Sequence, residues 1–229
     1  MNKLVKATLI GAAGISLFAF SLPNNGFEGI ITYSMSFGSS GNANSQMASM
    51  MQGSNRKVYV KGDKTRTEVN TGMYKSVTIT DMKTKEEITL VDMNGNKYEI
   101  KPTDKTKAAD DKPVIKLIDS TKTIAGYKCN AAVLTFTSKR DGQTYNSTVF
   151  YSDQLPYSED MGQFKGLKGC PLQFSIKQQG MDITVMAQSI EKKTLSDSLF
   201  TVPAKGYKVV ASREEMMKDM QENMGGSGQ

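Results

Sequence analysis

The chain has 229 residues, no histidine, no tryptophan and a formal net charge of +6 at pH 7. Without histidine it cannot build a Ser-His-Asp or Cys-His catalytic arrangement or a histidine-ligated zinc site. Its basic and acidic residues are interspersed, which is not the clustered basic pattern of a nucleic-acid-binding protein. Composition therefore excludes several enzyme classes and indicates no nucleic-acid partner.

Residues 1–21 are typical of a secretory signal peptide. Two lysines open the segment, a mostly apolar run follows over residues 8–20, and Ala19 and Ser21 are small residues at the positions of a cleavage site. We expect cleavage after Ser21 and export to the periplasm. Association with the outer membrane from the periplasmic side is compatible with this expectation. The run is too short for a typical membrane span. An uncleaved N-terminal anchor helix is the alternative.

Strand patterns dominate the sequence from residue 28 onward. In EGIITYSMSF, apolar residues at every second position alternate with polar ones, the period of a half-buried strand. Later strands are separated by turn signals at Gly62-Asp63, Asn94-Gly95, Asp141-Gly142 and Gln179-Gly180. About ten strands, joined mostly as hairpins, predict a mainly β domain with an antiparallel sheet and a few helices.

Two methionine-bearing segments depart from the strand pattern. Residues 42–54 predict a short helix or ordered loop, because their methionines have helical spacing. In SREEMMKDMQENMGG, Ser212 and Glu215 form a capping box, and a methionine-lined helix follows until Gly225. We expect both segments to cover apolar faces of the sheet. Thioether coordination of Cu(I) is the alternative.

Two cysteines in an exported chain predict one disulfide, Cys129–Cys170. Such a bond would hold the glycine-rich segment 158–170 against the sheet. Two free or redox-active thiols are the rival interpretation, although the chain has no Cys-x-x-Cys motif.

Six motifs occur in one order over residues 27–208: FEGIITYSMSF, VYVKGDKTRTEV, DSTKTIAGYKCNAAVLTF, VFYSDQLP, LKGCPLQFSI and LSDSLFTVPAKGYK. With these motifs the chain resembles a family of exported Gram-negative proteins of unknown function. That family is similar to the LolA/LolB-like superfamily of lipoprotein carriers. Carriers of that superfamily use an arginine near the groove mouth, and neither Arg56 nor Arg66 of the first hairpin is matched to it.

The resemblance implies a strongly curved, incomplete antiparallel β-barrel over residues 22–208, covered by short helices. Its concave face would hold acyl chains. Residues 209–229 would form an amphipathic C-terminal helix and a disordered tail.

From these observations we expect a monomeric, non-enzymatic protein without catalytic residues, cofactor or metal, which binds a lipid or other hydrophobic ligand. The predicted lining is Tyr33, Met35, Phe37, Met47, Met50, Met51, Val133, Phe150 and Phe174. The alternative is an envelope scaffold with a filled barrel that binds a protein partner. Methionine-based copper binding is a third hypothesis.

Overall fold

The computed structural model describes residues 26–39, 49, 51–101, 112–137, 142–155, 164–178 and 181–225. Twelve strands in these residues form one sheet. They are β1 (Gly29–Ser39), β2 (Asn55–Lys61), β3 (Lys64–Asn70), β4 (Lys75–Asp81), β5 (Glu86–Met93), β6 (Asn96–Ile100), β7 (Val114–Ile124), β8 (Tyr127–Thr137), β9 (Thr144–Ser152), β10 (Cys170–Gln178), β11 (Met181–Lys192) and β12 (Lys208–Val210). A 3-10 helix, η2 (Asp197–Phe200), and an α-helix, α2 (Arg213–Gly225), follow β11.

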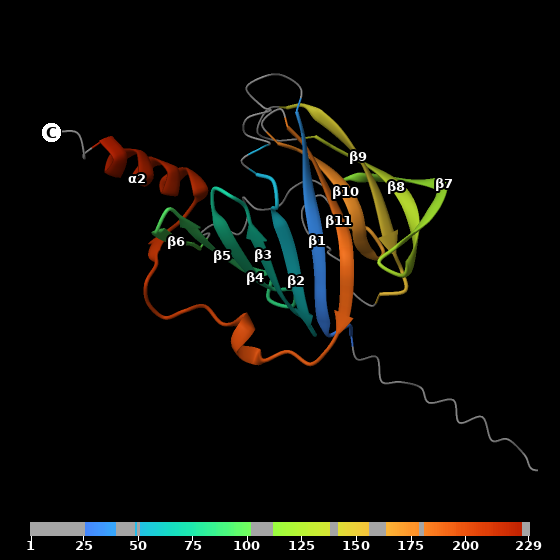
Figure 1. Ribbon diagram of the computed structural model, residues 1–229, viewed down its shortest axis with the longest axis horizontal. Helices are drawn as coiled ribbons and strands as arrows, with labels where there is room; N and C mark the ends of the chain where they lie inside the picture. Colours follow the sequence, from blue (N-terminus) through green and yellow to red (C-terminus); the bar gives the residue numbers. More distant parts are fainter. Residues whose placement is uncertain are drawn as a thin grey trace, which may run out of the picture.

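The sheet is built from two meanders that meet at β1. Its strand order is β12-β6-β5-β4-β3-β2-β1-β11-β10-β9-β8-β7, so β1 has β2 on one side and β11 on the other (Figure 1). All pairs are antiparallel except β12 with β6. The predicted mainly β, antiparallel fold is confirmed, with twelve strands in place of about ten. The order ends at β12 and β7, so the sheet is not closed.

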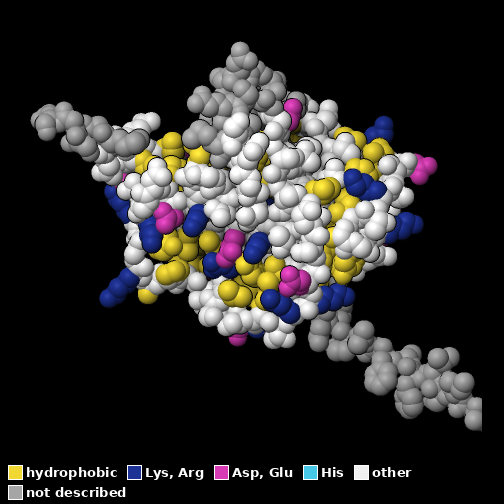
Figure 2. All heavy atoms as spheres, viewed as in Figure 1, with side chains coloured by type: hydrophobic (Ala, Val, Ile, Leu, Met, Phe, Trp, Pro, Cys, Tyr) yellow, Lys and Arg dark blue, Asp and Glu magenta, His cyan; other side chains and the backbone are white. Residues whose placement is uncertain are grey.

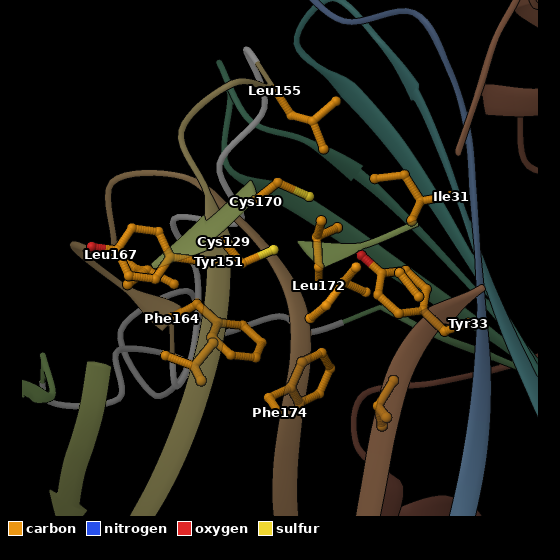
Figure 3. Close-up of a cluster of buried hydrophobic side chains, with 14 of the residues drawn as sticks. Ile31, Tyr33, Cys129, Tyr151, Leu155, Phe164, Leu167, Cys170, Leu172 and Phe174 are labelled. Carbon is orange, nitrogen blue, oxygen red and sulfur yellow. The ribbon is translucent and has the colours of Figure 1, made fainter. Parts of the chain in front are cut away.

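We call β1 to β6 the first meander and β7 to β11 the second meander. The second meander curls back on itself. β7 contacts β11 although three strands separate them in the sheet. In a flat sheet four strand spacings would hold these two strands about 19 Å apart. Inside the curl lies the main hydrophobic core, which includes Ile31, Tyr33, Leu172 and Phe174 (Figure 3). This half of the sheet therefore has the strong curvature that an incomplete barrel requires.

The connection between β9 and β10 contributes its own side chains to that core. Leu155, Phe164 and Leu167 are each at most 4% exposed and belong to the core cluster. The rings of Phe164 and Phe174 meet edge to face, with centroids 4.7 Å apart. Much of the space inside the curl is thus filled by the chain itself.

Gly169 explains the unusual Gly-Cys-Pro sequence at the start of β10. Its φ is +145°, a conformation that L side chains rarely adopt. A Cβ at this position would lie 2.7 Å from the carbonyl oxygen of Ser152 and 2.8 Å from the ring of Tyr151. Only glycine lets the chain enter β10 so close to β9.

Cys129 and Cys170 are two buried thiols in this structure, and the predicted disulfide is not formed. Cys170 pairs with Ser152 of β9, whereas Cys129 adjoins Asn130, which pairs with Tyr151 on the other side of β9. Two strand spacings are about 9–10 Å, beyond the roughly 7 Å between Cα atoms that a disulfide can bridge. Burial raises the pKa of the Cys129 thiol, which makes it a poor nucleophile.

The expected helical cover of the sheet is not found in the described residues. Of the described helices, α2 lies at the β6–β12 edge of the sheet (Figure 1), and the four-residue η2 contacts β3. The opposite face of the first meander is crossed by segment 193–207, which includes η2. Here Lys61 Nζ and Arg66 Nη1 donate hydrogen bonds to the carbonyl oxygens of Leu195 and Leu199. None of the described helices is long and apolar enough to cross a bilayer.

Substituting Gly169 by alanine should destabilise the protein by about 2–4 kcal/mol, because the new Cβ combines a strained φ with a clash against β9. Gly62→Ala is the matched control, since Gly62 also has a positive φ, +57°, but open space around its Cβ. That variant should lose only about 1 kcal/mol. Urea unfolding of both variants measures the difference. Equal losses of unfolding free energy in the two variants would show that the close approach of Gly169 to β9 does not require glycine.

Candidate functional site

Threonines line the middle of one face of the first meander. We call the inner face the one that carries Ile31, Tyr33 and Val58. Val58 pairs in register with Thr67 of β3, and Thr78 of β4 and Thr89 of β5 continue that row. The threonine strip comprises Thr65, Thr67, Thr78, Thr80 and Thr89, all on the inner face.

The threonine strip presents both methyl and hydroxyl groups. The hydroxyls of Thr78 and Thr89 lie 3.1 Å apart and share a hydrogen bond across β4 and β5. Thr67 and Thr78 in the middle of the strip are half-buried, whereas Thr65, Thr80 and Thr89 are buried. β-branched threonine suits a pleated, half-buried surface of this kind.

One side of the strip is bounded by the main core and Arg56. Arg56 of β2 pairs with Tyr33 of β1 and so lies on the inner face. Its Cζ is 5.2 Å from the ring centroid of Tyr33 and 5.7 Å from that of Phe174. With only 8% of its surface exposed, this cation is stabilised in part by the faces of two aromatic rings.

The other side of the strip is bounded by α2. Met216 packs with Val91, Tyr98, Ile100 and Val210 in a second hydrophobic cluster, to which Met220 adds a partly buried contact. Val91 and Tyr98 pair with each other on the inner face, because their row begins at Arg56. The threonine strip therefore lies between two apolar clusters on the same face of the sheet.

The carboxylate of Asp219 links α2 to β6 and β12. Asp219 accepts a hydrogen bond of 3.0 Å from the Tyr98 hydroxyl and forms an ion pair with Lys208. The hydrogen bond from Lys208, followed by that from Tyr98, lowers the pKa of the Asp219 carboxyl. The predicted cap is also present, since Glu215 N–H donates to Ser212 Oγ over 3.1 Å.

The structure brings together some of the predicted lining residues. Tyr33 and Phe174 meet at a centroid distance of 6.4 Å, but at 1% and 2% exposure they belong to the core. Met35, Phe37 and Phe150 are half-buried and pack against that core.

The other predicted lining residues lie elsewhere. Met51 is buried outside both hydrophobic clusters. Val133 alternates with the core residues Ala132 and Leu134, so it lies on the opposite face from them, beside exposed Lys116 and Thr148. Met47 and Met50 lie outside the described residues.

The threonine strip was not among the predicted site residues, although the sequence carries a signal for it. The tripeptides TRT (65–67) and TIT (78–80) occur in two consecutive strands. Their alignment on one face follows only when the register of β3 and β4 is known, because a shift by one residue would turn one pair outward.

A family model described as Domain of unknown function (DUF4412) matches residues 27–207. No protein in a search of the curated proteins matches the chain. Among solved structures, LprF from Mycobacterium bovis is similar at 10% identity and a TM-score of 0.30, covering 73% of this chain and 88% of that one. A TM-score this low supports no conclusion on fold or function, and the LolA/LolB-like link stays a prediction.

Acid should release α2 from the inner face. The pKa of the Asp219 carboxyl is lowered in the folded state, so its ionised form stabilises the docked helix at pH values above the ordinary pKa of 3.8. This stabilisation is lost as the pH falls through 3.8 and then through the lowered pKa. NMR signals of the α2 amides should therefore shift toward those of an undocked helix in this range. Asp219→Asn should show the undocked signals already at neutral pH.

Glu222→Gln is the control for that titration, because Glu222 forms only an exposed pair with Lys218, 3.9 Å away. Its α2 signals should stay docked at neutral pH. Unchanged signals in Asp219→Asn would contradict the role of Asp219 as the anchor.

Proposed function

The chain belongs to the DUF4412 family, and for this member we propose an exported, non-enzymatic protein that binds a hydrophobic ligand on its inner face. The ligand, such as a lipid acyl chain, would lie along the threonine strip between the main core and α2. Export rests on the signal-like residues 1–21. The first described strand begins at Gly29, so cleavage after Ser21 would leave every described element intact.

The placement of the threonine strip between two apolar clusters carries this proposal. The inner-face rows of β2–β5 contain two charged residues, Arg56 at one end and Glu87 at the other. Between them the rows consist of threonine, serine and valine. Thr65, Thr80 and Thr89 are buried, and the half-buried part is formed by Thr67, Val69, Ser76 and Thr78. Covering such a surface with an acyl chain removes apolar area from water without burying a charge.

The weak docking of α2 supports the same proposal. In the described residues the helix rests on Met216, Met220 and the Asp219 contacts. A helix of 13 residues is marginal by itself in water, so it depends on these contacts. Such an element can adjust to ligands of different length, as methionine side chains do.

A scaffold with a filled barrel is the second candidate, and the β9–β10 connection favours it. Leu155, Phe164 and Leu167 occupy the space inside the curl where a barrel carrier would hold its cargo. This function would need a protein partner and no lipid. The two candidates differ in whether the threonine strip binds an apolar molecule.

Placing a charge on the strip should abolish most ligand binding. In displacement of a fluorescent fatty acid, Thr78→Asp should weaken affinity by about tenfold or more, because a carboxylate under an acyl chain would lose its hydration. Thr78→Val keeps the shape of the side chain and should bind as well as the unmodified protein. Thr148→Asp, an exposed position on β9, is the matched control.

The threonine strip is not the ligand site if the unmodified protein binds no fatty acid, or if Thr78→Asp and Thr148→Asp have equal affinity. Urea unfolding of each variant separates a lost ligand contact from a lost fold. Specific retention of an envelope protein without any lipid would favour the scaffold.

A further inference from the structure

The accessible sulfur atoms in the described part of the chain belong to methionine. Both thiols, Cys129 and Cys170, are buried, so neither offers the accessible thiolate that peroxides oxidise most readily. In contrast, Met73, Met186 and Met217 are 41%, 37% and 48% exposed. In an exported protein, oxidation by peroxides would therefore begin at thioether groups.

Three methionines of α2 have different surroundings. Met216 is 5% exposed and belongs to the second hydrophobic cluster, and Met220 is half-buried and packs against that cluster. These two residues share one face of the helix because they are four positions apart. Met217 lies outside the cluster and is exposed. Hydrophobic side chains are visible on the surface at the upper left of Figure 2, in the region where Figure 1 places α2. Met220 thus combines a docking contact with access to solvent.

We propose that Met220 is an oxidation site for peroxides and that its sulfoxide releases α2 from β6 and β12. The thioether sulfur would donate an electron pair to one oxygen of hydrogen peroxide, and the O–O bond would break. The transferred oxygen would pass its proton to the leaving hydroxide, which departs as water. The sulfur loses two electrons and the peroxide gains them, so the step needs no other reactant.

A sulfoxide at this position would oppose docking. It converts an apolar side chain into a polar one, and a polar group packed against the cluster loses its hydration. Of the two docking methionines, α2 would keep Met216, together with the ion pair of Asp219, whose partner Lys208 is 59% exposed. Exposed ion pairs stabilise little, and a helix of 13 residues is marginal by itself. This release does not require a ligand on the threonine strip.

The test is titration of the exported protein with hydrogen peroxide. Peptide mass mapping follows the added oxygen at each methionine, and hydrogen exchange of the α2 amides follows docking. We expect Met73 and Met217 to be oxidised first, without any change in α2 exchange. Oxidation of Met220 should come next and should accelerate exchange of the α2 amides by about tenfold or more.

Two leucine variants form a matched pair for this titration. Met220→Leu keeps an apolar side chain of similar volume and removes the oxidisable sulfur. Its α2 amides should exchange slowly throughout the titration. Met217→Leu removes a sulfur that lies outside the cluster, so peroxide should release its helix as in the unmodified protein. Urea unfolding before oxidation checks that both variants keep the fold.

Three results would overturn the proposal. One is full oxidation of Met220 while exchange of the α2 amides stays slow. Another is a Met220 that stays unmodified at peroxide doses that fully oxidise Met73 and Met217. The third is equal release of α2 in Met220→Leu and in the unmodified protein, which would assign the effect to another oxidised residue. The first two are measured on the unmodified protein, so they do not depend on the stability of a variant.

Discussion

The whole sheet depends on the pairing of β1 with strands from both ends of the chain. β1 pairs with β2, its neighbour in sequence, and with β11, which begins more than 140 residues later. Without the second pairing, the two meanders would be separate sheets. Gly29 permits it, because a Cβ there would collide with the carbonyl oxygen of Glu191. The Tyr33 hydroxyl adds a hydrogen bond of 3.0 Å to the carbonyl oxygen of Pro171 in β10.

This arrangement divides the inner face into two parts with different properties. In the second meander, curvature and the β9–β10 connection produce a filled core. In the first meander, α2 contacts one edge, and Thr67 and Thr78 in the middle of the threonine strip are half-buried. Arg56 lies at the boundary, with its guanidinium over two rings of the core. A hydrophobic ligand and a filled core are therefore compatible in one sheet.

Local features were predictable from the sequence because their signals are local. The Asn94-Gly95 turn has positive φ at both residues, 54° and 85°, as a tight hairpin requires. The cap at Ser212 was also correct. Nonlocal features were not predictable. The neighbours of β1, the position of β9 between the two cysteines, and the face of Val133 all depend on which strands pair and in what register. Strand alternation identifies buried residues and does not distinguish a core from a binding surface, so the predicted lining includes core residues such as Tyr33 and Phe174.

Native mass spectrometry of the exported protein, purified without detergent, tests the proposed function most directly. The account predicts a fraction of molecules with excess mass, which is released on denaturation and identified as a lipid or another apolar molecule. The Thr78→Asp variant, purified in the same way, should lack that excess mass. A mass equal to the bare chain, in protein that also fails to take up added fatty acid, would contradict ligand binding and leave the filled scaffold as the function of this fold.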